Sequence, residues 1–206
     1  MNPNSLQGLP KLICKPSGRT SDVYTATIPH GQLIFRSFCL AQDLDTIYDW
    51  TRQTYSRRFW QMDRYSKEEL QEIYLSILQN PHAHSFIAFL NGSCIAQIDI
   101  YQVLIDELSA HVQASPHDCG IHLLMLPPEQ SKKDLSFYVL RSFFTYYFSF
   151  DSPGILYGEP DEKNFSANLL TKKAGFSFLK TIRLSYKTAN LYSITKRQFD
   201  ATNKIS

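Results

Sequence analysis

The feature that most constrains the fold is the stretch from Asp118 to Phe150, which reads as a strand, a polar loop and a helix. The strand is the apolar run Gly120–Leu126, and two prolines end it because proline cannot donate to a β-ladder. The loop, Glu129–Asp134, carries two lysines. Apolar residues then recur at helical spacing: Leu135, Val139, Leu140, Phe143, Phe144 and Tyr147. This arrangement predicts phosphate binding, because backbone N–H groups and the positive end of the helix face the loop.

A second strand-to-helix unit follows directly. Its strand and polar end span Gly154–Asp161, and a helical segment then runs to Ala174 before a glycine at position 175. In α/β sheets, ligands bind where parallel strands end. We therefore expect the first unit to hold a cofactor and the second to supply a polar catalytic rim.

Alternating and β-rich segments predict further strands. The clearest hairpin runs from Phe86 to Tyr101 around Asn91-Gly92, which favours a type I′ turn. The other expected strands are Val23–Ile28, Leu33–Phe38, Ser177–Leu184 and Lys187–Ile194. The segment Val103–Gln113 reads as irregular, and a polar tail is expected after Phe199.

Two helices are expected before residue 80. The capping box Ser66–Glu69 opens one that runs to about Gln79. An earlier helix is expected to be capped by Asp43 or Asp45, and an aromatic and basic patch at Tyr55–Trp60 follows it. The order of all these elements predicts an α/β fold with a mixed sheet.

The composition fits one globular domain. We expect it to span residues 21–206, behind a loose arm of residues 1–20 that is rich in Pro, Gly, Ser and Asn. An apolar fraction of 43% suffices for a sizeable core. The net charge of +2 lacks the excess of basic residues that nucleic-acid binding needs.

The four cysteines are scattered and show no CxxC spacing: Cys14, Cys39, Cys94 and Cys119. The sequence therefore predicts neither disulfides nor a zinc site, and no other ligand cluster predicts a metal. No apolar run approaches the roughly 20 residues of a membrane span, and the N-terminus lacks a signal-peptide pattern. We expect a soluble, cytoplasmic protein that does not bind a membrane.

Three motifs resemble those of a known family. They are Gly120-Ile121-His122-Leu123-Leu124, Glu159-Pro160-Asp161-Glu162-Lys163-Asn164 and Ala174-Gly175-Phe176. Together they resemble the siderophore-biosynthesis branch of the GNAT superfamily, whose members acylate the N6 amine or hydroxylamine of lysine-type substrates, as in aerobactin and mycobactin assembly. The resemblance covers roughly residues 33–200. It implies a mixed, mainly antiparallel central sheet flanked by helices, and acetyl-CoA or another acyl-CoA as the acyl donor.

The resemblance also implies a substrate side made of aromatic and acidic residues: Trp50, Trp60, Asp99, Tyr101 and Asp106. Glu159 lies two residues before Asp161, so on a strand it faces the same side and would share an acidic patch with it. The aromatic side chains would wall a channel for an aliphatic amine, and a carboxylate would hold its charged end. Core packing is the alternative for each aromatic residue. For Glu159 the alternative is a solvent-facing strand end.

The expected catalytic pair is His122 and Asp161. Histidine titrates nearest neutral pH, so His122 is the candidate acceptor of the nucleophile's proton. Its alternative is a hydrogen-bonded core histidine. Asp161 would orient His122 or hold the substrate, and its alternative is to cap the following helix.

Five residues are expected to bind the cofactor: Leu124, Lys132, Lys133, Leu135 and Asn164. The Leu124 N–H would stabilise the oxyanion, the lysines would bind phosphates, and Asn164 would contact the pantetheine arm. The alternatives are a solvated lysine pair and a helix cap at Asn164. The family's Arg-Gly-x-Gly loop corresponds here to Lys132–Leu135, which contains no glycine.

The resemblance, together with these residues, implies an acyl-CoA-dependent N-acyltransferase, acting as a monomer or weak dimer on a small amine or hydroxylamine in siderophore biosynthesis. The alternatives are a GNAT-fold enzyme for another amine, in an antibiotic or a protein, and a non-catalytic binding module.

Overall fold

A computed structural model describes residues 22–203 of the chain, with the side chains of residues 23–202. The chain divides into two compact units. The N-terminal unit comprises residues 22–99 and 122–142, and the C-terminal unit comprises residues 100–121 and 143–203. The expected arm at residues 1–20 lies outside the described residues, and the prediction of one domain over 21–206 stays a prediction.

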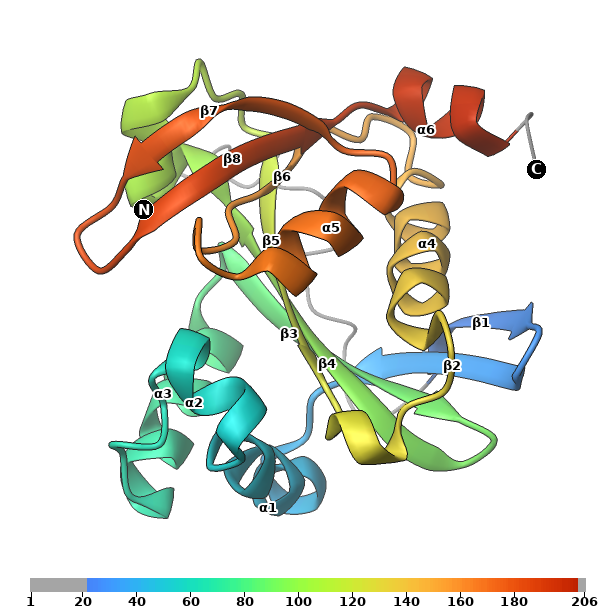
Figure 1. Cartoon of the computed structure of the whole chain (residues 1–206), viewed down its shortest axis with the longest axis vertical. Coiled ribbons are helices and arrows are strands. Elements are labelled where there is room, and N and C mark those ends of the chain that lie inside the picture. Colours follow the sequence, from blue (N-terminus) through green and yellow to red (C-terminus); the bar gives the residue numbers. More distant parts are fainter. Residues whose placement is uncertain (1–21, 204–206) are drawn as a thin grey trace. The chain divides into compact units, whose positions relative to one another are not determined.

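The strands form an eight-stranded sheet in the order β1-β2-β3-β4-β5-β6-β8-β7 (Figure 1). They are β1 (Asp22–Ile28), β2 (Gly31–Ser37), β3 (Ala83–Leu90), β4 (Ser93–Gln102), β5 (Cys119–Met125), β6 (Leu156–Gly158), β7 (Ser177–Arg183) and β8 (Thr188–Ile194). The pair β5–β6 is parallel, whereas β1–β2, β2–β3, β6–β8 and β7–β8 are antiparallel. The predicted mixed, mainly antiparallel sheet is confirmed.

The helices are α1 (Leu40–Thr51), α2 (Thr54–Trp60), α3 (Lys67–Gln79), α4 (Leu135–Tyr147), α5 (Phe165–Lys173) and α6 (Lys196–Asn203). Short 3₁₀ helices are η2 (Val103–Ile105), η3 (Glu107–His111) and η4 (Pro128–Gln130). Both expected strand-to-helix units are therefore present, as β5 with α4 and β6 with α5.

Two β-hairpins build the sheet of the N-terminal unit, as predicted. In the turn between β3 and β4, Asn91 and Gly92 have φ values of 50° and 84°. Positive φ at both positions is the type I′ geometry that Asn-Gly favours. The Asn91 side chain also accepts the Gln32 N–H at 2.9 Å, which ties this turn to the β1–β2 hairpin.

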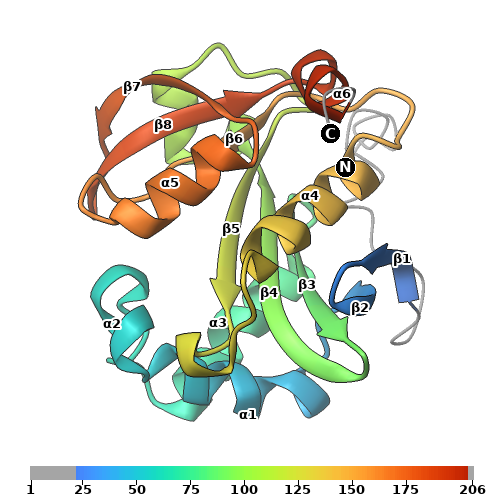
Figure 2. The same cartoon turned by 45° about the vertical axis from the view of Figure 1, so that its right-hand side comes forward.

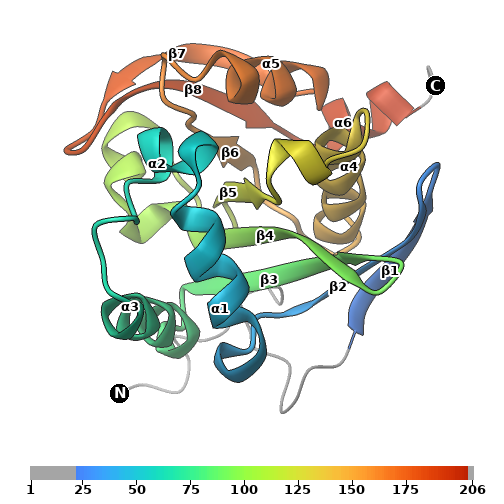
Figure 3. The ribbon, with the colours of Figure 1, turned by 60° about the horizontal axis from the view of Figure 1, so that its bottom comes forward.

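The capping box of α3 is confirmed, because Ser66 and Glu69 bond to each other's backbone N–H groups. The predicted start of α1 is wrong. The helix begins at Leu40, and Asp43 lies buried inside it, where it accepts bonds from Arg36 at 2.7 and 2.6 Å and from the Cys39 N–H at 2.7 Å. Figure 3 shows α1 beside α3.

Two helices were not predicted. Helix α2 has only seven residues, too few for a helical period to emerge from the sequence. Helix α6 lies where a polar tail was expected. Among its described residues, Phe199 is the one large apolar side chain that is buried, so the sequence shows no apolar helical period there. The segment predicted as irregular contains η2 and η3.

In the C-terminal unit, α5 packs along β8 (Figure 2). Asn168 of α5 accepts hydrogen bonds from Asn190 at 2.8 Å and from Tyr192 at 2.9 Å. Helix α5 ends before Gly175, whose φ of 104° is a conformation that glycine adopts without strain. The core beside this sheet is apolar and comprises Val103, Leu108, Tyr157, Ile182, Leu184, Ala189 and Leu191.

Candidate active site

The register between β4 and β5 places two predicted site residues opposite each other. The Leu126 N–H bonds to the Ile95 carbonyl at 2.9 Å, which aligns the two neighbouring strands. Four residues further along β4 and four back along β5, Asp99 lies opposite His122. Opposite residues of an antiparallel pair project to the same face, with Cβ atoms about 4.5–5.5 Å apart. Both residues keep part of their surface exposed.

The same register holds at the other end of the strand pair, within the C-terminal unit. The Val103 N–H bonds to the Asp118 carbonyl at 3.0 Å. The Tyr101 ring covers Gly120, where an added Cβ would lie 2.1 Å from the ring. Both contacts fit the same residue pairing as the bond between Leu126 and Ile95. The pairing of β4 with β5 is therefore not shifted by a β-bulge between its two ends.

Helix α2 lies against β5. The Trp60 ring meets the His122 ring edge to face, with centroids 6.2 Å apart. The Tyr55 hydroxyl donates to the Met125 carbonyl at 2.6 Å. Trp60 is partly exposed, so its ring borders the imidazole without being sealed in the core. The structure therefore brings Trp60, Asp99 and His122 together within the N-terminal unit.

A buried polar network surrounds Asp99. The Gln97 amide donates to the Asp99 carboxylate at 2.9 Å and to the Ser85 hydroxyl at 3.1 Å. The buried Tyr74 hydroxyl donates to the Gln97 carbonyl oxygen at 2.9 Å. Burial raises the pKa of the Asp99 carboxyl above its ordinary value, against the opposing effects of the Ser85 hydroxyl, the His122 imidazole and the Gln97 amide.

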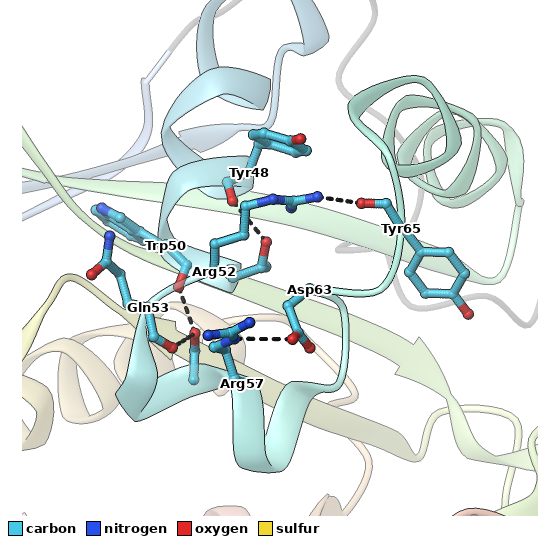
Figure 4. A network of polar contacts seen from close by, with 9 residues as sticks. Tyr48, Trp50, Arg52, Gln53, Arg57, Asp63 and Tyr65 are labelled. Atoms are coloured by element: carbon cyan, nitrogen blue, oxygen red, sulfur yellow. Dashed lines mark hydrogen bonds and ion pairs between the residues drawn. The ribbon is translucent and has the colours of Figure 1, made fainter.

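A second polar network holds α2 in place (Figure 4). The Ser56 hydroxyl donates to the Trp50 carbonyl at 2.5 Å, and Arg57 pairs with Asp63 at 3.0 Å. Trp50 itself is buried in α1 with 7% of its surface exposed. This favours the core-packing alternative for Trp50, whose backbone carbonyl helps to fix the helix that carries Trp60.

Arg52 completes this network from the end of α1. Its guanidinium stacks on the Tyr48 ring at 3.5 Å from the centroid and donates to the Tyr65 carbonyl at 2.5 Å. Stacking combined with a directed hydrogen bond suits the planar guanidinium of arginine. The connection between α2 and α3 is thereby tied to α1.

The basic loop between β5 and α4 makes its sharp turn without glycine. Asp134 adopts a φ of 60°, in the left-handed region that aspartate tolerates better than most residues. His30 bonds through Nε2 to the Lys133 carbonyl at 2.8 Å and packs edge to face on Tyr138 of α4. The Lys132 and Lys133 side chains are exposed. This exposure fits both alternatives, lysines that bind phosphate groups and lysines that only contact solvent.

The backbone N–H groups of Leu135 and Leu124, two residues expected to bind the cofactor, are directed toward other parts of the chain. Leu135 is buried, and its N–H donates to the Lys132 carbonyl at 3.1 Å, so it builds the helix start. In the register above, the backbone of Leu124 faces β4, whereas Leu123 and Met125 face away from it, as the bond from Tyr55 to the Met125 carbonyl shows for Met125. The N–H groups of Leu123 and Met125 are thus better placed than that of Leu124 to meet a ligand, and sequence reasoning missed them.

The C-terminal unit holds a separate acidic and aromatic cluster. Glu159 is 3% exposed and pairs with Lys187 at 3.5 Å. Burial raises the pKa of Tyr101 well above its ordinary value, and the charge of Glu159 adds to this effect. Burial and the same carboxylate raise the pKa of the Tyr186 hydroxyl. Glu159 is therefore not at a solvent-facing strand end, and it lies near two tyrosines.

The remaining predicted residues of this unit have local structural roles. Asp106 caps η3 by accepting the Leu108 N–H at 2.8 Å. Asn164 caps α5 by accepting the Ala167 N–H at 3.1 Å, so the capping role expected of Asp161 belongs to Asn164. The Asp161 carboxylate instead accepts the Lys163 N–H at 2.8 Å. His122 and Asp161 belong to different units, and their action as a pair stays a prediction.

Sequence reasoning missed the residues that support Asp99. Gln97, Ser85 and Tyr74 are separated along the chain, and only the strand pairing and the position of α3 bring them together. The sequence does contain one signal of this network. Gln97 and Asp99 are two residues apart on a strand, so their side chains project to the same face.

The remaining features concern metal binding, thiols and membrane spans within residues 22–203. In that range no three His, Cys, Asp or Glu side chains group closely enough to hold a metal ion. Cys39, Cys94 and Cys119 are free thiols, and Cys14 lies outside the described residues. None of the helices in this range is long and apolar enough to cross a membrane.

The sheet is mainly antiparallel with one parallel strand pair, a basic turn precedes α4, and a partly exposed histidine lies on β5. Comparison with protein families identifies the class of protein. Residues 39–184, more than half of the chain, match the acetyltransferase (GNAT) domain family. The chain belongs to this family and is an acyl-CoA-dependent N-acyltransferase.

Individual relatives are distant. The chain is 24% identical over 164 residues to an N-hydroxyputrescine acetyltransferase of Acinetobacter baumannii, covering 80% of this chain and 78% of the relative. An uncharacterized protein from Bacillus halodurans has a similar structure, with a TM-score of 0.82, 21% identity and coverage of 89% of this chain and 95% of the other. The aminoglycoside acetyltransferase AAC(6')-Ib in complex with coenzyme A gives a TM-score of 0.75 at 24% identity, with coverage of 83% of this chain and 99% of the other. These two structures support the fold.

Proposed function

We propose that the protein transfers an acetyl group from acetyl-CoA to the primary amine or hydroxylamine of an aliphatic diamine or lysine-like acceptor, as a step of siderophore biosynthesis. The observation that carries this proposal is the partly exposed His122 imidazole on β5, bordered by the Trp60 ring and the Asp99 carboxylate. An aromatic wall beside a base suits an aliphatic amine whose reacting nitrogen must lose a proton.

The reaction requires one new bond and one broken bond. The nitrogen lone pair of the acceptor forms the C–N bond to the thioester carbon, the C–S bond breaks, and its electron pair leaves with sulfur, which takes up a proton as the free thiol. His122 accepts the proton that the attacking nitrogen loses. The N–H groups of Leu123 and Met125 would stabilise the negative charge on the thioester oxygen, in place of the Leu124 N–H, which faces β4.

Binding of the donor depends on the basic loop. The Lys132 and Lys133 side chains are exposed and would hold phosphate groups of coenzyme A, while the first turn of α4 presents backbone N–H groups. Asp134, with its left-handed backbone conformation, supplies the sharp turn of this loop. Asn164 and Asp161 remain candidates for contacts with the pantetheine arm and the acceptor. Since the donor is acetyl-CoA, we place the reaction in the cytoplasm, with the enzyme as a monomer or weak dimer.

Recognition of the acceptor's second charged group would fall to acidic and aromatic side chains. Glu159 lies near Tyr101 and Tyr186, and Asp106 acts on both tyrosines electrostatically. A carboxylate with tyrosine rings suits an ammonium group, and an acceptor ammonium would have to replace Lys187 as the partner of Glu159. The choice of a hydroxylamine acceptor rests on the printed activity of the Acinetobacter relative, N-hydroxyputrescine acetylation.

The test is an acceptor panel at fixed acetyl-CoA concentration. N-hydroxyputrescine, N6-hydroxylysine, putrescine, lysine, kanamycin and a lysine-containing peptide are compared by thiol release and by the mass of the product. We expect the highest kcat/KM for one of the two hydroxylamines. Preference for kanamycin, which the likeness to the aminoglycoside enzyme makes the second candidate, or for the peptide would overturn the proposed acceptor class.

A further inference from the structure

The β4–β5 register places Asp99 next to His122, so Asp99 has a candidate partner within the protein besides the acceptor. Asp99 and His122 are opposite residues on neighbouring strands, and both project to the face that Trp60 borders. At that spacing a carboxylate and an imidazole interact directly or through one water molecule. The pairing follows from backbone alignment and does not depend on a flexible loop.

The Asp99 carboxylate is also held in place. Gln97 donates to it at 2.9 Å, and Gln97 is itself fixed by Ser85 and by the buried Tyr74 hydroxyl. Tyr74 stacks on Phe38 with ring centroids 4.6 Å apart, which anchors the network in the core. A carboxylate meant only to meet a mobile substrate would not require such support, whereas a group that orients another side chain does.

We propose that Asp99 is the positioning residue of His122, which it orients and whose protonated form it stabilises while the acceptor nitrogen loses its proton. The proposal rests on the proposed function of His122 as proton acceptor. In this arrangement the proton moves from nitrogen to imidazole, and the positive charge that forms there faces a fixed negative charge.

The other charged groups on the elements that contact His122 have different partners. On α2, Arg57 pairs with Asp63, Arg58 lies over the Phe59 ring, and the Tyr55 hydroxyl bonds to a backbone carbonyl. Strand β4 carries Asp99 as its carboxylate. Asp99 is therefore the acidic group that these two elements direct to the face of His122.

The first test is a titration of the His122 imidazole by NMR, with its signal assigned by its loss in His122→Gln. In Asp99→Asn the pKa of His122 should fall by about one pH unit or more, because a neighbouring negative charge is removed. Asp45→Asn is the matched control: Asp45 is an exposed carboxylate on α1 paired with Lys67, and its loss should leave the His122 titration unchanged. An unchanged titration in Asp99→Asn would overturn the proposal.

The second test is kinetic and separates positioning from acceptor binding. In Asp99→Asn, kcat should fall about 10²-fold, a typical contribution of acid–base groups, with KM for the amine nearly unchanged. The acidic limb of the kcat/KM profile should move to lower pH, and Asp99→Glu should recover part of kcat. A raised KM with an unmoved pH profile would show that Asp99 binds the acceptor, which contradicts positioning.

The outcomes also separate this inference from the proposed function. Full activity in His122→Ala would refute the proposed function, whatever Asp99 does. Loss of activity in His122→Ala with a normal His122 titration in Asp99→Asn would refute only the positioning role. If Asp99→Asn does not fold, Asp99→Ser undergoes the same titration and must show the same fall in the pKa of His122.

Discussion

At the scale of single residues, the Tyr101 ring lies directly over Gly120 on the β4–β5 face. A methyl group at position 120 would lie 2.1 Å from the Tyr101 ring carbon Cζ. Gly120→Ala should therefore displace the ring and lower the free energy of unfolding by about 1–3 kcal/mol, as overpacking does. Urea denaturation followed by circular dichroism measures the change.

The matched control for that substitution lies in the same unit. At Gly158 an added Cβ would meet Phe176 at 3.6 Å, an ordinary contact distance. Gly158→Ala should stay within about 0.5 kcal/mol of the parent protein. Equal stability losses in the two variants would show that the Tyr101 ring does not occupy the face of Gly120.

Asp99 makes a pH-dependent contribution to stability with a definite sign. Burial raises the pKa of its carboxyl in the folded chain, so the folded state binds this proton more tightly than the unfolded state does. The contribution of Asp99 to the free energy of unfolding is therefore present below the unfolded pKa of about 3.9 and is lost as pH rises through the folded pKa. Asp99→Asn should gain in Tm relative to the parent between pH 4 and pH 7, measured by differential scanning calorimetry.

An opposite response is expected at Asp63. A hydrogen bond from Arg57 lowers the pKa of the Asp63 carboxyl, so its stabilising contribution is present above the unfolded pKa and is lost as pH falls through the folded pKa. Asp63→Asn should therefore have a lower Tm than the parent above about pH 4, and the difference should shrink as pH falls below that value. Parallel pH responses in the two variants would contradict the raised pKa of the Asp99 carboxyl.

At the scale of elements, α3 provides the cleanest test of local sequence signals. Ser66 accepts the Glu69 N–H at 3.2 Å and Glu69 accepts the Ser66 N–H at 2.7 Å. Ser66→Ala should lower the free energy of unfolding by about 1 kcal/mol. Ser76→Ala, at an exposed position inside the same helix, should be neutral or slightly stabilising because alanine favours the helix. A neutral Ser66→Ala would contradict the role of the capping box.

Elements were predictable from the sequence where a local signal was strong. The Asn91-Gly92 turn, the Ser66 capping box and the apolar period of α4 each predicted the element that is present. Helix α2 carries no such local signal. Its position is fixed by contacts with residues distant in the sequence, such as Met125, which the local sequence does not reveal. The start of α1 was misplaced because Asp43 bonds to Arg36 of β2, a partner that the local sequence does not reveal.

At the scale of the whole molecule, the mixed sheet and the two strand-to-helix units followed from the order of elements and from the motifs around His122 and Asp161. The partnership of Asp99 with His122 did not, since it depends on a register that only the paired strands define. The burial of Trp50 is likewise decided by tertiary packing, which a single sequence leaves open.

Binding of acetyl-CoA should stabilise the whole protein. A ligand present at 100 times its Kd adds about 2.7 kcal/mol to the free energy of unfolding, so Tm should rise with acetyl-CoA concentration. The double substitution Lys132→Ala with Lys133→Ala should reduce this rise, more at low salt than at high salt, because phosphate contacts are electrostatic.

The control for that experiment removes two other exposed lysines, Lys172 and Lys173 at the end of α5. Each variant is compared with its own Tm without ligand, so any change in intrinsic stability cancels. An equal reduction in both double variants would show that net charge, and not the basic loop, governs binding.

The central claim is that this GNAT-family enzyme acylates an amine with His122 as the proton acceptor. Its most direct test is the rate of thiol release from acetyl-CoA with N-hydroxyputrescine, measured for the parent protein and for His122→Ala at equal folded concentration. The account predicts turnover by the parent and a loss of about 10²- to 10⁴-fold in the variant. Equal rates, or no turnover by the parent with any amine of the panel, would contradict it.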